Sequence, residues 1–217
     1  MQLKRVVVTG MGAITPIGNT LEEYWKGLLN GVSGAGPITQ FDASKFKTRF
    51  ACEIKGFDPT QFMDKKEARK LDRFAQLALA VSDQAMQDAG LNKENINPDR
   101  VGVVFASGIG GLTTFQHEVT DFAKGDGTPR FNPFFIPKMI LDIAAGQISM
   151  RHNLRGPNFA VVSACASSTN AIMDAFNLIR LGKADIILTG GSESVISEAG
   201  VGGFNAMKAM SERNDDP

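Results

Sequence analysis

The stretch that decides the fold is Val161–Asn170, with the sequence VVSACASSTN. A short apolar run at residues 159–162 is typical of a buried strand, and a helical pattern begins directly after it. Cys165 is therefore expected at the point where a strand becomes a helix. Apolar residues cover most of the circumference of the helix over residues 167–181, which predicts that this helix is buried.

Cys165 at a helix start would be suited to nucleophilic chemistry. The first turn of a helix presents unpaired N–H groups and the positive end of the peptide dipoles, which stabilise a thiolate. The same N–H groups suit an oxyanion formed when sulfur attacks an acyl group. Small neighbours leave room for a substrate; they are Ala164, Ala166, Ser167 and Ser168. The alternative is a small buried hydrophobe, as most free cysteines are.

Composition excludes several classes of protein. The 217 residues suit one large domain or two small ones, and 43% hydrophobic content suffices for a sizeable core. Because 23 basic residues balance 23 acidic ones, no global field recruits nucleic acid or an anionic membrane. Cys52 and Cys165 are far apart and lack metal-ligand spacing, which argues against a disulfide framework and a metal site. With no leader and no long apolar run, we expect a cytoplasmic protein.

Alternating strands and helices predict an α/β fold with a mostly parallel sheet. The expected strands are Lys4–Thr9, Val101–Ala106, Asn158–Ser163 and Asp185–Thr189. The expected helices, besides the one after Cys165, run from a Thr20 cap to Leu29, from Lys65 to Ala89 and from Met139 to Met150.

Glycine-rich loops follow two of these strands. Gly10, Gly12 and Gly18 are wrongly spaced for a dinucleotide fingerprint. The loop Ser107–Gly111 is either a phosphate cradle or the wall of an apolar pocket, and the absence of the P-loop lysine and hydroxyl favours the wall. Phe131–Pro137 is too apolar for free solution and is expected to line a pocket or a subunit interface.

A basic cluster begins the helix predicted from residue 65. Lys65, Lys66, Arg69 and Lys70 oppose the helix dipole there, so the cluster gains no local stability. It is interpreted either as a docking surface for an acidic partner or as a solvated face.

Six motifs in register carry a family resemblance over the whole chain. They are VVVTGMG at 6–12, SGIGG at 107–111, RGP at 155–157, ACASS at 164–168, GGSE at 190–193 and GVGGF at 200–204. Together they resemble the β-ketoacyl-acyl-carrier-protein synthase II family of ketosynthases. The resemblance implies one thiolase-like domain over residues 1–217, truncated before its last strand and lacking the C-terminal half. It also implies cap or interface insertions near 32–64 and 111–140.

The resemblance further implies a condensing enzyme of type II fatty acid synthesis. The cysteine matching Cys165 would take an acyl group as a thioester, with its own backbone N–H as one oxyanion donor. Malonyl carrier protein would then lose carbon dioxide and attack that thioester. No cofactor or metal is implied, because the substrates arrive on the phosphopantetheine arm of acyl carrier protein. A homodimer is implied as well.

By similarity, two groups of residues acquire roles. The acyl pocket would be bordered by Gly108, Ile109, Ala164 and Phe204, with Phe135 reaching across the family's dimer interface. The carrier-protein docking patch would comprise Lys66, Arg69 and Lys70, with Arg130 and Lys208 nearby. An acidic carrier would suit that surface.

The histidines depart from the family pattern. Family members use two histidines, a lysine and a gating phenylalanine, and here His117 and His152 lie outside the family's histidine motifs. We therefore expect His152 to be a helix-end residue, His117 a surface residue, and the isolated chain to be inactive in condensation. A non-catalytic acyl-binding or interaction fragment of the same fold is the alternative. The hypothesis of an unrelated cysteine acyltransferase or thioesterase is weaker, since such an enzyme would need a histidine base near the cysteine.

Overall fold

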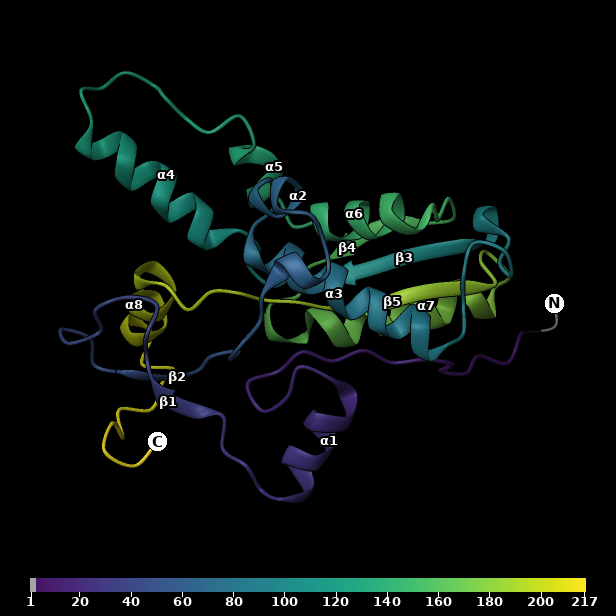
Figure 1. The fold of residues 1–217 in the computed structure, drawn as a ribbon, viewed down its shortest axis with the longest axis horizontal. Helices are drawn as coiled ribbons and strands as arrows, with labels where there is room; N and C mark the ends of the chain where they lie inside the picture. The colour runs from purple at the N-terminus through teal and green to yellow at the C-terminus, as the bar shows by residue number, and fades with distance from the viewer. Residues whose placement is uncertain (1–2) are drawn as a thin grey trace.

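Three parallel strands form the centre of the structure, a computed structural model that describes residues 3–217 (Figure 1). Strand β3 (Val101–Ala106) lies between β4 (Asn158–Val161) and β5 (Ile186–Gly191). Every residue of β3 is buried, as expected for the middle strand of a parallel sheet covered on both faces.

Helices cover both faces of this sheet (Figure 1). Helix α7 (Ser167–Arg180) packs against one face, while α6 (Ile143–His152) and α3 (Arg73–Asp88) lie on the other. The side chains of β3 alternate between two apolar clusters: Val101 and Val103 pack toward α3 and α6, and Val104 packs toward α7.

The remaining elements surround this body. The helices are α1 (Leu21–Leu29), α2 (Lys65–Arg69), α4 (Leu112–Lys124), α5 (Phe135–Met139) and α8 (Glu198–Ala206). A separate antiparallel pair consists of β1 (Ala35–Pro37) and β2 (Phe50–Cys52), and three short 3-10 turns are η1 (Pro59–Gln61), η2 (Pro98–Arg100) and η3 (Ala164–Ala166). Among the described helices, none is both long and apolar enough to cross a membrane.

Several local predictions are confirmed. The strand Val101–Ala106 has the expected bounds, and the sheet is parallel. Helix α1 begins after Thr20, whose hydroxyl accepts a hydrogen bond from the Glu23 N–H at 3.2 Å. Its end is followed by Gly31 in the left-handed region, where glycine is favoured.

The strand predicted over Lys4–Thr9 is wrong. The segment forms no strand, and Val8 is 79% exposed. It is anchored at its start, where Lys4 donates its backbone N–H to the Arg180 carbonyl and forms an ion pair with Asp185. Further on, the Met11 N–H donates to the Asp88 carboxylate rather than to a strand. An apolar run becomes a strand only where a neighbouring strand accepts its ladder hydrogen bonds.

The long helix predicted from Lys65 to Ala89 is also wrong, because it is two helices. Helix α2 ends at Arg69, and α3 begins after Asp72. Asp72 is 5% exposed and caps α3 by accepting from the Phe74 N–H. The predicted helix Met139–Met150 is likewise interrupted, since Met139 ends α5 and α6 starts at Ile143.

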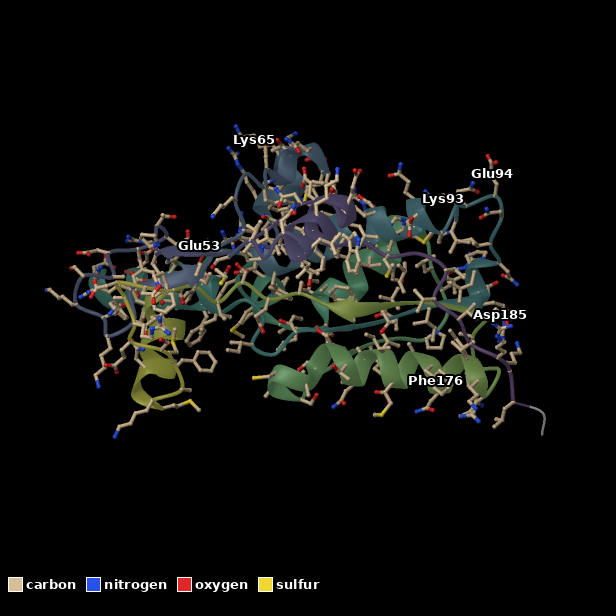
Figure 2. The ribbon with its side chains drawn as sticks, turned by 90° about the horizontal axis from the view of Figure 1, so that it is seen from below. Glu53, Lys65, Lys93, Glu94, Phe176 and Asp185 are labelled. Atoms are coloured by element: carbon tan, nitrogen blue, oxygen red, sulfur yellow. The ribbon has the colours of Figure 1, made fainter. Side chains whose placement is uncertain are left out.

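Helix α7 is not buried around its whole circumference as its sequence predicts. Ala171 and Ala175 are buried against the sheet, but Ile172 and Met173 are each more than half exposed, and Phe176 is 41% exposed. Figure 2 shows Phe176 on the side of α7 that faces away from the sheet. The described chain therefore covers only one of the two apolar faces of this helix.

Two segments lie outside the sheet. Residues 111–140 carry α4, which projects from the body in Figure 1, and four phenylalanine rings pack against one another between α4 and the segment that follows it. They are Phe115, Phe122, Phe131 and Phe135. Residues 32–64 carry β1 and β2, where Phe41 packs edge-on against Phe46.

An ionic network joins α3 to α6. Asp83 accepts hydrogen bonds from the Arg151 guanidinium at 2.6 and 2.8 Å, and the His152 Nε2 lies 3.2 Å from its carboxylate. Burial alone would raise the pKa of Asp83, but hydrogen bonds from His152 and Arg151 outweigh it and hold that pKa below its ordinary value. The charged form of Asp83 therefore stabilises the fold.

We expect Asp83→Asn to lower the free energy of unfolding by about 1 to 3 kcal/mol at neutral pH, since Arg151 loses its carboxylate. A depressed pKa gives stability that is present above the unfolded-state value, about 3.8, and is lost as pH falls through the folded-state value. The difference between variant and wild type should thus shrink below about pH 4 in urea unfolding curves. The exposed pair of Asp126 and Arg130 supplies the control: Asp126→Asn should change stability by less than about 0.5 kcal/mol. An equal loss from both variants would contradict the network's role.

Candidate active site around Cys165

Three loops meet where the parallel strands end. Ala106, the last residue of β3, is paired with Val161 of β4 and with Gly191 of β5. The carboxyl ends of the three strands therefore lie at one edge of the sheet, which is where open α/β sheets place their ligand sites. Beyond that edge lie the Ser107–Gly111 loop, the turn that holds Cys165, and Glu193.

The turn before Cys165 is sharp and held by side chains. Ala164 has φ of 51°, a left-handed conformation that costs about 1 to 3 kcal/mol for a residue with a Cβ. The buried Ser167 hydroxyl donates to the Ala164 carbonyl at 2.6 Å and accepts from the Ser163 N–H at 2.8 Å. Asn170 donates to the Ser163 hydroxyl at 2.7 Å. These bonds over-determine the turn and fix the direction in which Cys165 leaves the sheet.

Cys165 lies in η3, directly before α7, as the sequence predicts. Its side chain is exposed, so in this structure it is not a buried core residue. Within residues 3–217 its backbone N–H makes no hydrogen bond, whereas the next N–H, that of Ala166, donates to Ser163. Attack on an acyl carbon requires an accessible thiol, and the oxyanion that forms requires an N–H donor. Cys165 supplies both at the start of a helix.

The Ser107–Gly111 loop is not an empty anion cradle. Its N–H groups converge on the carboxylate of Glu193: Gly108 donates at 2.8 Å, Ile109 at 2.9 Å and Gly110 at 3.2 Å. An internal carboxylate thus occupies the position that a phosphate would take. This arrangement supports the interpretation of the loop as a wall.

Glu193 is the residue of this edge that reasoning from the sequence missed. It appears in the sequence only as the end of the GGSE motif, after two glycines that follow an apolar strand. Its partners lie more than 80 residues away along the chain, so no local pattern connects them. The one available signal was its position at the carboxyl end of a predicted parallel strand.

The predicted acyl-pocket residues are only partly brought together. Gly108 lies against the nucleophile's turn, since a Cβ built on it would be 3.3 Å from the Ala164 carbonyl oxygen. Ile109 is 38% exposed beside it. Phe204 lies on α8, and Phe135 begins α5, where its ring stacks on Phe131 at 5.5 Å.

Two surface hollows are present elsewhere on the molecule. One is lined by Pro37, Phe50 and Asn214, and the other by Trp25 and Met11. Neither includes Cys165, so the proposed acyl pocket is not one of them.

The predicted docking residues are all exposed. Lys66 and Arg69 lie on α2, and Lys70 caps its end with its ammonium 5.4 Å from the centre of the Phe134 ring. This contact places the end of α2 beside the segment that follows Arg130, as α2 and α5 lie together in Figure 1. Lys208 lies just beyond α8, and Arg130 forms an ion pair with Asp126 at 3.2 Å.

Neither histidine is placed as a base for Cys165. His152 is the last residue of α6 and binds Ser82 and Asp83 of α3, as a helix-end residue. His117 is exposed on α4. Across residues 3–217 no group of three or more His, Cys, Asp or Glu side chains is arranged to hold a metal ion.

Known proteins resemble this chain along its length. The family model described as "Beta-ketoacyl synthase, N-terminal domain" matches residues 3–217. The "3-oxoacyl-[acyl-carrier-protein] synthase 2" of Synechocystis is 48% identical over 217 residues, which are 100% of this chain and 52% of that protein. The protein of the same name from Vibrio cholerae is 44% identical over 217 residues, with the same two coverages. The chain thus spans about half the length of the curated relatives it matches.

Solved structures share the fold. A β-ketoacyl synthase from Burkholderia phymatum superposes with a TM-score of 0.87 at 31% identity, covering 99% of this chain and 53% of that one. A ketosynthase solved with its type II polyketide acyl-carrier protein and a hexaketide gives a TM-score of 0.83 at 26% identity, covering 98% of this chain and 51% of that one. This chain therefore belongs to the β-ketoacyl synthase family, and its described fold is that of the family's N-terminal domain.

Proposed function

We propose that this chain is the nucleophile-bearing half of a 3-oxoacyl-[acyl-carrier-protein] synthase, a condensing enzyme of type II fatty acid synthesis. The observation that carries the proposal is the exposed Cys165 at the junction of β4 and α7, with its backbone N–H free among the described residues. The relatives of the same name, up to 48% identical among those compared, supply the reaction class.

In the first step the Cys165 sulfur attacks the carbonyl carbon of an acyl thioester on acyl carrier protein. The new S–C bond forms first and gives a tetrahedral oxyanion; its collapse breaks the carrier's C–S bond, and the carrier leaves as a thiol that takes up the Cys165 proton. The oxyanion of the intermediate lies against the free Cys165 N–H. Because Ser167 and Asn170 hold the turn, that N–H is oriented before the substrate arrives.

In the second step malonyl carrier protein loses carbon dioxide, and the electron pair of the broken C–C bond attacks the acyl carbon. Cys165 then leaves as a thiolate. The family's two histidines belong to this step, whereas His152 is bound to Asp83 and His117 is exposed on α4. We infer that this chain alone is acylated but does not condense.

The partner in both steps is acyl carrier protein, and the exposed cations of α2 support this proposal. Within residues 3–217, Lys66, Arg69 and Lys70 have no ion-pair partner. One related ketosynthase was solved in complex with its acyl-carrier protein. An acidic carrier would be attracted to this surface by long-range electrostatics.

The whole protein is further proposed to be a cytoplasmic homodimer without a cofactor, with Phe135 reaching toward the neighbouring pocket. The exposed apolar face of α7 supports a second half in that protein: Ile172, Met173 and Phe176 form a stripe at helical spacing. The same face favours the second candidate, a fragment that binds acyl groups or another protein without catalysis.

Incubation of the purified chain with an acyl thioester should add one acyl mass at Cys165, because this thiol is exposed beside a free N–H. Intact-mass spectrometry measures the adduct. Cys165→Ser should abolish it. Cys52→Ser is the matched control, since Cys52 is also an exposed thiol and should leave the adduct unchanged. An adduct that survives in Cys165→Ser would reject Cys165 as the nucleophile and favour the non-catalytic candidate.

The purified 217-residue chain should not release carbon dioxide from malonyl carrier protein above the buffer rate, because neither of its histidines lies free beside Cys165. The measurement is trapping of labelled carbon dioxide, with an active full-length synthase as the positive control. Release that depends on Cys165 would show that the chain needs no further residues for decarboxylation.

Reversing the charge of Lys66 should weaken binding of acyl carrier protein by about tenfold at low salt, and high salt should abolish the difference. Titration calorimetry or fluorescence anisotropy measures the affinity. Lys93→Glu is the control, because Figure 2 shows Lys93 far from Lys65 along the molecule. Equal weakening by Lys66→Glu and Lys93→Glu would indicate a general charge effect instead of a docking patch.

A further inference from the structure

The carboxylate of Glu193 is held by a full set of donors. Its Oε2 accepts from the N–H groups of Gly108 and Ile109, at 2.8 and 2.9 Å. Its Oε1 accepts from the Ser107 hydroxyl at 3.1 Å and from the Gly110 N–H at 3.2 Å. The Ser107 hydroxyl in turn accepts from the same Gly110 N–H at 3.1 Å, which closes the arrangement.

These hydrogen bonds between Glu193 and residues 107–110, called here the Glu193 clamp, fix the backbone of the loop and leave the Ile109 side chain unbound. Gly110, which donates the last of these three N–H groups, adopts φ of 76°, a conformation that an L side chain rarely takes. Ser107, at 2% exposure, is anchored in the core. Ile109 is held to Glu193 through its backbone N–H alone, and the residue remains 38% exposed.

The clamp also touches the nucleophile's turn. Gly108 lies between them: a Cβ built on it would be 3.0 Å from Glu193 Oε2 and 3.3 Å from the Ala164 carbonyl oxygen. Any shift of the loop toward Cys165 would therefore bring Gly108 against Ala164. Gly108 is therefore packed between Glu193 and the turn that holds Cys165.

We propose that Glu193 is a positioning residue that holds the Gly108–Gly110 wall at a fixed distance from Cys165 and thereby sets the length of acyl group the site accepts. This inference rests on the proposed function. A wall built from one apolar side chain on an immobile backbone discriminates by volume, and one methylene in such a pocket changes the rate by about tenfold or more. Without the bonds to Glu193, residues 108–110 could move away from Cys165, and the site would accept longer acyl chains.

The test measures acylation of Cys165 in the purified chain with butyryl, octanoyl and dodecanoyl thioesters of N-acetylcysteamine. In Glu193→Gln an amide N–H group would face the loop donors, so the clamp opens while the side chain keeps its size. We expect the ratio of the dodecanoyl to the butyryl rate to change by at least about fivefold. Alkylation of Cys165 by iodoacetamide, which uses no acyl pocket, should change less than about twofold.

Glu198→Gln is the matched control. Glu198 begins α8 and accepts a hydrogen bond from Gln116. Glu198→Gln is therefore the same chemical change as Glu193→Gln, five residues away in the sequence, at a residue with no bond to the loop. Its chain-length ratio should equal that of the wild type. An unchanged ratio of dodecanoyl to butyryl rates in Glu193→Gln would overturn the proposal. Equal slowing of all thioesters and of iodoacetamide would overturn it too, because it would indicate that Glu193 serves the folding of the turn.

A second variant and a second measurement guard against misfolding. Ser107→Ala removes one donor of the clamp and should shift the ratio in the same direction by a smaller factor. Hydrogen exchange of the Gly108, Ile109 and Gly110 amides should accelerate about tenfold or more in Glu193→Gln, whether or not the chain is acylated. A wild-type chain that accepts no acyl group rejects the proposed function, whereas acylation with an unchanged ratio in both variants rejects only the role of Glu193.

Discussion

The register of β3 between its two parallel neighbours is the constraint on which the site depends. Because Ala106 is opposite both Val161 and Gly191, three loops from distant parts of the chain begin at the same level of the sheet. A slip of one residue in either pairing would turn the following loop to the other face. A slip between β3 and β4 is opposed inside the core at Gly102, where a Cβ would lie only 2.6 Å from the Pro157 carbonyl oxygen, so no larger residue can take that place. The core thus determines the distance between the nucleophile's turn and the glycine loop.

Strain at the turn is sustained by the same core. The left-handed φ of Ala164 persists because Ser167, only 3% exposed, binds both sides of it from the first residue of α7. Helix α7 is in turn fixed to the sheet through Ala171 and Ala175. A strained residue beside an exposed thiol is the pattern expected of a preorganised site, in which surrounding contacts enforce a geometry that the local sequence disfavours.

The elements that the sequence predicts well are those with local causes. Val101–Ala106 is uniformly apolar, and Thr20 carries its own capping oxygen, so both follow from neighbouring residues. The failed strand over Lys4–Thr9 depends on a partner strand, which its own sequence cannot supply. The predicted long helix is divided at Asp72, which caps α3 locally and is also bound by Thr114, more than 40 residues further along the chain. Glu193 was not predicted because its hydrogen-bond donors are distant along the chain, and a single acidic residue has no periodicity that reveals them.

The Glu193 carboxylate determines which chemical groups can bind at the Ser107–Gly111 loop. Consecutive backbone N–H groups attract anions, so an unoccupied loop beside Cys165 would compete for the phosphate of an incoming substrate arm. With Glu193 bound there, the N–H groups are satisfied, and the loop presents Ile109 as an apolar surface. The side chain of Glu193 is tethered at the end of β5, so it binds without the entropy loss that a free anion would incur. The same hydrogen bonds that remove an anion site therefore create an apolar wall next to the nucleophile.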